Sequence, residues 1–293
     1  MFIATLIAKD RLSSGDISSA EDALAEAGVH SFGRSWIEAD VACDLLFSAS
    51  PQRARAMLEG LIAGVDVIVQ GETGRRKKLL IADMDSTMIT IECIDELADY
   101  AGIKPQIAEI TERAMRGELD FEAALDARVG LLKDLGEEVI DRCHAERVKL
   151  SGGAIALVRT MRREGASTLL VSGGFTHFAD RVARDIGFER VLSNRLGLAE
   201  GKLDGTVARP IVGAETKKAA LIEAAAAREI DLADTLAVGD GANDIPMIEA
   251  AGLGVAYHAK PRTAAAAAAR IDHCDLTALL YAQGYARAEW EKE

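Results

Sequence analysis

The residues most suited to chemistry are two aspartates, Asp83 and Asp85, which directly follow the short apolar run Leu79–Ala82. Such a run predicts a buried strand. Two carboxylates one residue apart at the end of a strand repel each other unless a cation lies between them. A second acidic loop, residues 239–244, follows another apolar run, residues 236–238. Because the carboxyl ends of parallel strands share one sheet edge, we expect both loops to meet around one Mg²⁺.

This pair of acids suits phosphoryl transfer. A carboxylate is ionised at neutral pH and can attack phosphorus without a partner base, so we expect Asp83 to be the nucleophile and to form an aspartyl-phosphate. Asp85 would first protonate the leaving oxygen and then activate the hydrolytic water. Alternate residues of an extended segment face the same side, so the spacing places one acid on phosphorus and the other on the leaving group. Taken alone, such a pair is more often a solvated turn.

A third segment, Ser172-Gly173-Gly174, is suited to phosphate binding and again follows an apolar run. Glycines at a strand-to-helix turn let backbone N–H groups approach a phosphate, and the Ser172 hydroxyl can donate a further hydrogen bond. The alternative is an ordinary turn capped by the serine. Lys217 begins a later helical segment, where its ammonium would neutralise the phosphate and the charge of the nucleophile. Without such a context, a lysine is usually a surface residue.

The second acidic loop supplies the oxygen ligands that Mg²⁺ prefers. Asp240 would bind the ion directly, whereas Asn243 and Asp244 would hold metal-bound water or orient Lys217 from outside the coordination sphere. The five histidines are dispersed and show no zinc-site spacing. The four cysteines are also scattered, which predicts reduced thiols.

In this order, the four segments resemble the motifs of the haloacid dehalogenase superfamily of phosphatases. The similarity extends over about residues 79–285. It implies a Rossmann-like core, Mg²⁺ dependence and an aspartyl-phosphate. It also implies that Asp83 and Asp240 give carboxylate oxygens to the metal, and that Asp85 gives its main-chain carbonyl.

Two charges in the helical stretch that follows could select a substrate. Glu92 and Arg128, if they face the site, would hold an ammonium and a carboxylate, which together describe the zwitterion of an amino acid. Their positions alone also allow both to be solvated helix charges. Around them the resemblance narrows to the phosphoserine phosphatase family. It is carried by residues 83–96, by residues 113–117, and by Phe121, Glu122 and Arg128.

That narrower resemblance implies a set of substrate-binding residues. The acid matching Glu92 contacts the substrate amine, and the arginine matching Arg128 contacts the carboxylate. The residues matching Met115 and Phe121 line the pocket, and Asn243 is also expected to contact the substrate.

The implied activity is the Mg²⁺-dependent hydrolysis of O-phospho-L-serine to L-serine and phosphate, the last step of L-serine biosynthesis. A related phosphatase acting on phosphohomoserine, phosphothreonine or another small phosphomonoester is the nearer alternative. A phosphate-binding regulatory protein without turnover is the alternative from another class. The presence of both Asp83 and Asp85 argues against it, because a binding protein needs neither acid.

The elements that must position these residues change character near residue 75. Residues 1–75 have the order βαββαβ, which predicts a small ferredoxin-like α+β domain. On element order alone, this unit resembles the ACT-like regulatory domain found on some of these enzymes. In residues 76–293 strands alternate with helices, which predicts an α/β fold with an open parallel sheet. The mostly helical stretch at about residues 91–160 follows the first core strand and is interpreted as a cap over the strand ends.

The pattern also predicts individual elements. In the first unit, helices are expected at residues 18–27 and 51–63, and the Ala-rich stretch Thr263–Ala269 is expected to be a helix of the core. The expected core strands are Leu79–Ala82, Thr168–Val171, Arg190–Asn194, Leu236–Val238 and Leu253–Tyr257.

The bulk composition excludes several classes of function. The chain has 293 residues, 49% apolar and 28% charged, which is typical of a folded globular protein. A net charge of −13 argues against a broad nucleic-acid surface. No run approaches the ~18 apolar residues of a membrane helix. The apolar start, residues 1–8, lacks a basic leader and predicts a strand rather than a signal peptide. We expect a cytoplasmic enzyme; its oligomeric state stays open, a homodimer included.

Overall fold

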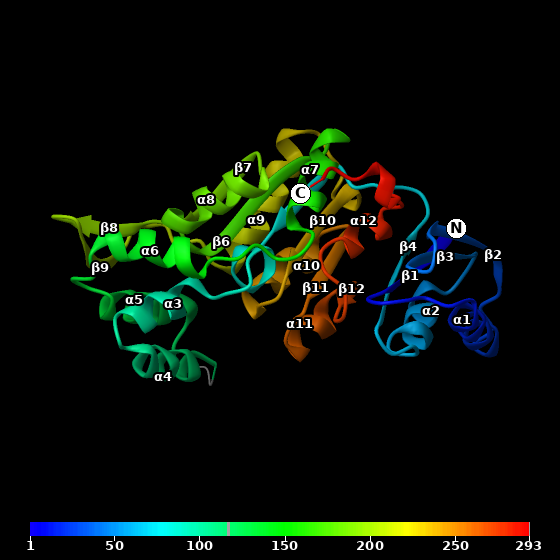
Figure 1. The fold of residues 1–293 in the computed structure, drawn as a ribbon, viewed down its shortest axis with the longest axis horizontal. Helices are drawn as coiled ribbons and strands as arrows, with labels where there is room; N and C mark the ends of the chain where they lie inside the picture. Colours follow the sequence, from blue (N-terminus) through cyan, green and yellow to red (C-terminus); the bar gives the residue numbers. More distant parts are fainter. Residues whose placement is uncertain (116–117, 293) are drawn as a thin grey trace.

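The core of the molecule is a six-stranded parallel sheet. The computed structural model describes residues 1–115 and 118–292 (Figure 1). The strand order is β12-β11-β10-β5-β6-β7, and each neighbouring pair is parallel. This arrangement confirms the predicted α/β fold class. The strands are β5 (Leu79–Ala82), β6 (Ser167–Phe175), β7 (Arg190–Asn194), β10 (Thr235–Gly239), β11 (Leu253–Tyr257) and β12 (Ala269–Ile271).

Both faces of this sheet are covered by helices, because successive side chains of a strand point to opposite faces. On one face Leu80 belongs to a buried cluster that includes Phe178 of α8. On the other face Ile81 packs in a cluster with Leu221 of α9. Because β5 is buried on both faces, all of its residues can be apolar, and its sequence is a continuous apolar run. The covering helices are α7 (Ala154–Arg163), α8 (Thr176–Ile186), α9 (Ala214–Ala227) and α10 (Ile245–Ala250).

Four helices inserted between β5 and β6 form the expected cap. They are α3 (Cys93–Tyr100), α4 (Lys104–Met115), α5 (Phe121–Leu131) and α6 (Glu137–Arg147). A hairpin of β8 (Leu196–Ala199) and β9 (Lys202–Val207) packs against α5. Figure 1 shows α3, α4 and α5 gathered at the side of the core away from the N-terminal sheet. Because α7 contacts α8 and β6, we propose that the cap ends before α7, near residue 150.

The N-terminal residues build a separate four-stranded antiparallel sheet with order β2-β3-β1-β4. Its βαββαβ sequence confirms the ferredoxin-like architecture, while the likeness to ACT domains stays a prediction. The elements are β1 (Phe2–Ala8), α1 (Ser14–Glu26), β2 (Ser31–Glu38), β3 (Ala42–Phe47), α2 (Pro51–Leu58) and β4 (Val65–Gly71).

Buried polar contacts join this small sheet to the core. The Asp66 carboxylate accepts hydrogen bonds from the backbone N–H groups of residues 272–274 at 2.8–3.3 Å. Arg75 donates to Asp44 at 2.7 Å and also to the main-chain carbonyl of Ala282. Charge-assisted bonds of this kind are stronger than neutral ones, so the two sheets have a defined junction.

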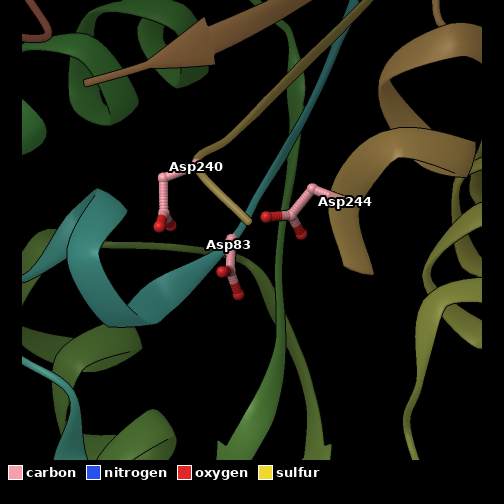
Figure 2. A group of neighbouring side chains, drawn as sticks. All are labelled: Asp83, Asp240 and Asp244. Carbon is pink, nitrogen blue, oxygen red and sulfur yellow. The ribbon is translucent and has the colours of Figure 1, made fainter. Parts of the chain in front are cut away.

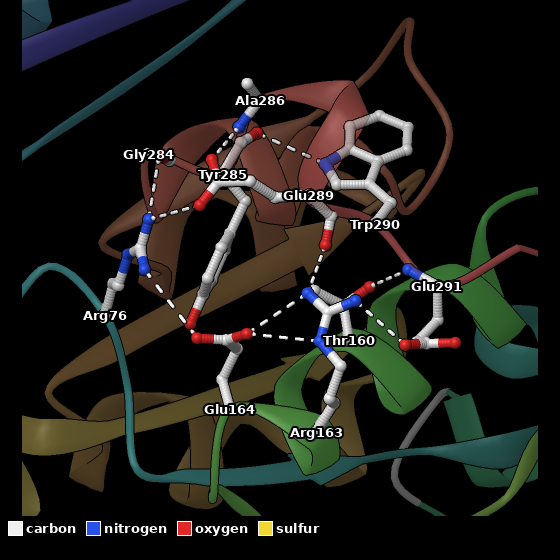
Figure 3. Close-up of polar contacts among 10 residues, drawn as sticks. All are labelled: Arg76, Thr160, Arg163, Glu164, Gly284, Tyr285, Ala286, Glu289, Trp290 and Glu291. Carbon is white, nitrogen blue, oxygen red and sulfur yellow. Dashed lines mark hydrogen bonds and ion pairs between the residues drawn. The ribbon is translucent and has the colours of Figure 1, made fainter.

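The C-terminal segment is tied to the core as well. Arg76 pairs with Glu289 at 3.0 Å, and Arg163 of α7 pairs with Glu291 at 2.8 Å (Figure 3). The Trp290 indole donates to the Tyr285 carbonyl at 3.2 Å. These contacts hold the chain end after α12 (Ala278–Ala282) against α7.

Two helix boundaries differ from the prediction. Helix α1 begins at Ser14 rather than near Ser18, because Ser13 caps it: Ser13 Oγ accepts from the Asp16 N–H at 3.1 Å, and the Asp16 carboxylate accepts from the Ser13 N–H at 2.8 Å. This is a reciprocal capping box. Helix α2 ends before Glu59, whose backbone is extended, and not near residue 63.

The predicted helix Thr263–Ala269 is wrong at its end. The helix α11 spans only Pro261–Ala266, and Ala269–Ile271 forms the edge strand β12. That strand pairs in parallel with β11, from Val255 opposite Ala269 onward. Pairing with the sheet therefore overrides the intrinsic helix preference of alanine.

Candidate active site

The two predicted acidic loops meet at the carboxyl edge of the sheet. Strands β5 and β10 are neighbours, and Asp83 and Asp240 directly follow them. One oxygen from each of Asp83, Asp240 and Asp244 lies within 4.8 Å of the other two. Figure 2 shows the three carboxylates gathered at these strand ends. The strand order reverses between β5 and β10, and such a switch point is where open α/β sheets bind ligands.

Lys217 is fully buried between two of these carboxylates. Its Nζ donates to Asp83 Oδ1 and to Asp244 Oδ1, each at 2.7 Å. Burial alone would lower the pKa of this ammonium, but the carboxylates of Asp244 and Asp83 raise the pKa overall. The Gly241 N–H donates to Asp244 Oδ2 at 2.9 Å. Asp244 therefore fixes Lys217, and Lys217 fixes one oxygen of Asp83.

One ammonium does not balance three carboxylates. Burial, reinforced by Asp244, raises the pKa of Asp83 well above its ordinary value. Burial and Asp244 also raise the pKa of Asp240 to about 7. The Thr87 hydroxyl donates to Asp240 Oδ1 at 2.9 Å. The ionised cluster therefore calls for further positive charge, and hard oxygen donors this close together fit a divalent cation such as Mg²⁺.

Asp85 lies beside the predicted phosphate-binding loop. A Cβ added at Gly174 would lie 2.8 Å from Asp85 Oδ2, so a larger residue would displace this carboxyl group. Asp85 Oδ1 is buried and has no hydrogen-bond partner among the described residues. Burial, and then the charge of Glu92, raises the pKa of Asp85 to about 7. A carboxyl group with this pKa can both give and take a proton at neutral pH.

The predicted phosphate loop occupies the end of β6, on the other side of β5 from β10. Ser172 is buried, and its Oγ accepts a hydrogen bond from the Gly174 N–H at 2.9 Å. A Cβ added at Gly173 would lie 3.2 Å from the ring of Phe121 and 3.9 Å from the Asn243 amide nitrogen. The missing side chain thus leaves space between the loop, the cap and the second acidic loop.

Glu92 and Arg128, the two charged residues expected to bind the substrate, lie in the cap. The Ser86 hydroxyl donates to Glu92 Oε1 at 2.6 Å. Although part of Glu92 is exposed to solvent, burial raises the pKa of its carboxyl group. Arg128 Nε donates to the Ala124 carbonyl at 3.2 Å. Burial lowers the pKa of Arg128, while Asp95 and Glu92 act in the opposite sense. The opposite charges of Glu92 and Arg128 therefore influence one another.

The remaining pocket residues are placed only in part. Phe121 begins α5 and reaches from the cap toward the core, where a Cβ added at Gly213 would lie 3.3 Å from its ring. Asn243 lies in the short 3₁₀ turn Ala242–Asp244, which is part of the second acidic loop after β10. Met115 ends α4, and its side chain lies outside the described part of the structure.

Sequence reasoning missed three polar residues that support the site. Ser86 and Thr87 hold Glu92 and Asp240 through their hydroxyls. Their position directly after Asp85, inside the first motif, could have indicated that they lie at the site. Asn194 ends β7 and is buried, and no local pattern in the sequence distinguishes it.

A sequence model of the haloacid dehalogenase-like hydrolases matches residues 80–249, which is more than half of the chain. The chain belongs to this family. A curated relative of this hydrolase, a phosphoserine phosphatase of Streptomyces coelicolor, is 42% identical over 243 residues. The alignment covers 82% of this chain and 59% of the relative, so the hydrolase spans less than two thirds of that relative's length.

Solved structures of similar proteins extend the comparison. A probable phosphoserine phosphatase from Vibrio cholerae, in unliganded form, has a TM-score of 0.78 and 32% identity, covering 98% of this hydrolase and 88% of that chain. A phospho-aspartyl intermediate analogue of phosphoserine phosphatase has a TM-score of 0.66 and 38% identity, covering 70% of this hydrolase and 98% of that chain.

The family match includes every acidic residue of the cluster at the sheet edge. Asp83, Asp240 and Asp244 all lie within the matched range.

In residues 1–115 and 118–292, the structure contains no helix with the length and apolar character that crossing a membrane requires.

Proposed function

We propose that this hydrolase is a Mg²⁺-dependent phosphoserine phosphatase, which converts O-phospho-L-serine to L-serine and phosphate in the last step of L-serine biosynthesis. The observation that carries the proposal is the placement of Lys217, buried at 2.7 Å from both Asp83 and Asp244 beside the phosphate loop. The similarity to relatives named phosphoserine phosphatase supports the choice of substrate.

The first chemical step is a transfer of the phosphoryl group to Asp83. Lys217 binds Asp83 Oδ1, which leaves Oδ2 to attack phosphorus. The new Oδ2–P bond forms as the bond between phosphorus and the serine oxygen breaks. Asp85, in its protonated form, gives its proton to that leaving oxygen, because a free alkoxide leaves poorly. The products of this step are L-serine and an aspartyl-phosphate.

The second step is hydrolysis of the aspartyl-phosphate. Asp85, now ionised, takes a proton from a water molecule, whose oxygen forms a bond to phosphorus. The bond between phosphorus and Asp83 breaks, and the carboxylate is restored. A pKa of about 7 suits Asp85 to both roles. The same residue serves in both steps because the second step is the reverse of the first, with water in place of the serine hydroxyl.

The carboxylates of Asp83 and Asp240, with the main-chain carbonyl of Asp85, would hold the metal ion. When bound, a divalent cation there would neutralise negative charge on the phosphoryl oxygens. Asp244 would stay outside the coordination sphere and orient Lys217, whose Nζ donates to its Oδ1, while the Gly241 N–H donates to its Oδ2. Ser172, the Gly173 N–H and Lys217 would bind the remaining phosphoryl oxygens.

Substrate choice would rest on the cap. Arg128 can hold a carboxylate through two parallel hydrogen bonds, and Glu92 can accept hydrogen bonds from an ammonium. The ring of Phe121 would cover the short carbon chain. A phosphorylated amino acid carries both of these charges, and the similarity to relatives named phosphoserine phosphatase points to serine.

Phosphate release measured with malachite green tests the proposal. We expect turnover of O-phospho-L-serine with Mg²⁺ and none after chelation with EDTA. Phosphoethanolamine lacks the carboxylate, and 3-phosphooxypropionate lacks the amine; both should show a much lower kcat/KM. Equal turnover of 3-phosphooxypropionate would exclude the role of Glu92. A higher kcat/KM for phosphohomoserine or phosphothreonine would move the assignment to a related phosphatase.

A further inference from the structure

The phosphate-binding loop is an interruption of the sheet. Strand β6 pairs with β7 up to Val171 opposite Leu192, and the pairing resumes only at Phe175 opposite Asn194. Three residues of β6, 172–174, therefore face a single residue of β7. Such a bulge leaves backbone groups without their ladder partners. The Gly173 carbonyl is one of these groups, and it needs another donor.

The side chain of Asn194 supplies that donor. Its Nδ2 donates to the Gly173 carbonyl at 2.9 Å and to the Val212 carbonyl at 3.3 Å. Its Oδ1 accepts a hydrogen bond from the Val212 N–H at 2.8 Å. The side chain is almost completely buried, with 1% of the residue exposed. All three bonds require an amide, because only an amide offers two donors and an acceptor in this geometry.

The second partner of Asn194 leads directly to the catalytic lysine. Val212 is followed by Gly213, which is the N-cap of α9. The Gly213 carbonyl accepts a hydrogen bond from the Lys217 N–H at 3.0 Å. A movement of Val212 would therefore shift the first turn of α9 and the ammonium that it carries.

We propose that Asn194 is a positioning residue, which holds the phosphate loop at Gly173 in register with the segment that places Lys217. The inference rests on the proposed phosphatase function of these two elements. Among the described residues, the hydrogen bonds of the Asn194 side chain go to Gly173 and Val212 and not to Glu92 or Arg128. Its loss should therefore damage phosphate binding and phosphoryl transfer, and leave recognition of the amino-acid part intact.

Asn194→Asp tests this directly because it keeps the shape of the side chain and removes both donors. Its carboxylate would face the carbonyl oxygens of Gly173 and Val212 and push them apart. A displacement of a substrate-positioning group by about 1 Å can lower the reaction rate on the order of 100-fold. We therefore expect kcat to fall by about 100-fold. Ser193→Ala is the matched control, since Ser193 precedes Asn194 and its hydroxyl contacts Thr176. It should leave kcat unchanged.

Inhibition by each product separates a positioning role from a purely structural one. In Asn194→Asp the inhibition constant of inorganic phosphate should rise at least tenfold, while that of L-serine stays within twofold of the wild type. Wild-type constants for both products, or an equal weakening of both, would overturn the proposal. Should Asn194→Asp fail to fold, Asn194→Ser keeps one donor, and its inhibition constants decide in the same way.

The same experiment distinguishes failure of the inference from failure of the proposed function. If the wild type does not turn over O-phospho-L-serine, the substrate assignment is wrong. The role of Asn194 is then measured with p-nitrophenyl phosphate as substrate and inorganic phosphate as inhibitor. A variant that matches the wild type in both measurements excludes the positioning role.

Discussion

Replacing Lys217 by methionine should destabilise the protein as well as inactivate it. The ammonium is 0% exposed and lies 2.7 Å from each of two buried carboxylates. Removing one partner of a buried ion pair costs about 3–5 kcal/mol, because the other partner stays buried and unpaired. Two charge-assisted hydrogen bonds of about 1.5–3 kcal/mol each give a similar figure. We expect the free energy of unfolding of Lys217→Met to fall by about 3–5 kcal/mol.

Thermal unfolding followed by circular dichroism measures this effect. For a protein of this size, about 2–4 °C per kcal/mol converts the loss into a fall in Tm of roughly 6–20 °C. Lys218→Met is the control, because Lys218 follows on the same helix but is partly exposed. Its effect should stay within about 0.5 kcal/mol. A Tm for Lys217→Met equal to that of the control would refute the ion-pair arrangement.

The loss should also depend on pH. Burial and Asp244 already raise the pKa of Asp83, and removing Lys217 raises it further. A carboxyl group whose folded pKa exceeds its unfolded pKa favours the folded state below the unfolded pKa, and that contribution disappears as the pH rises through the folded pKa. The Tm difference between Lys217→Met and the wild type should therefore be smaller at about pH 5 than at about pH 8. A difference that grows toward acid pH would contradict this reasoning.

Three further predictions concern the chemistry and the cap. Gly174→Ala places a Cβ 2.8 Å from Asp85 Oδ2, so kcat should fall at least tenfold in steady-state assays; Gly130→Ala, where a Cβ meets no atom within 4 Å, is the control, and equal kcat values in the two would remove the argument. Because the pKa of Asp85 is about 7, leaving-group protonation weakens above this pH and water activation weakens below it. Quenched-flow experiments should therefore show a burst of L-serine near pH 6 and none near pH 8, and a burst confined to the alkaline side would invert the assignment. Glu92→Gln keeps the hydrogen bond from Ser86 but removes the charge, and should raise KM for O-phospho-L-serine by about 10-fold or more, since hydrogen bonds to charged groups contribute about 1.5–3 kcal/mol; an unchanged KM would exclude the contact with the amine.

Much of the core was predictable because its strands are short apolar runs. Strands β5, β7 and β11 have the predicted bounds. Strands β5 and β11 are buried along their whole length, whereas β7 is an edge strand that is only partly buried. The meeting of the two acidic loops followed from the rule that parallel strands share a carboxyl edge. The predicted neighbours Asp83 and Asp240 are therefore close in space.

Other features depend on contacts that no local pattern contains. The edge strand β12 exists because β11 offers it hydrogen-bond partners, although its first residue, Ala269, ends an alanine-rich stretch that favours a helix. The three hydrogen bonds of Asn194 join segments that are far apart in the sequence. An asparagine in a short polar stretch reads equally well as a turn residue. The bond between Lys217 and Asp244, in contrast, is one of the two roles that the sequence allowed for Asp244.

The most direct test of the whole account is to locate the transferred phosphoryl group. Enzyme mixed with O-phospho-L-serine and Mg²⁺ can be quenched in acid within one turnover, digested, and analysed by mass spectrometry. The account predicts one added phosphoryl group on the peptide that contains Asp83, and none in Asp83→Asn. Phosphate release by the wild type with no label on this peptide, or undiminished turnover by Asp83→Asn, would contradict it.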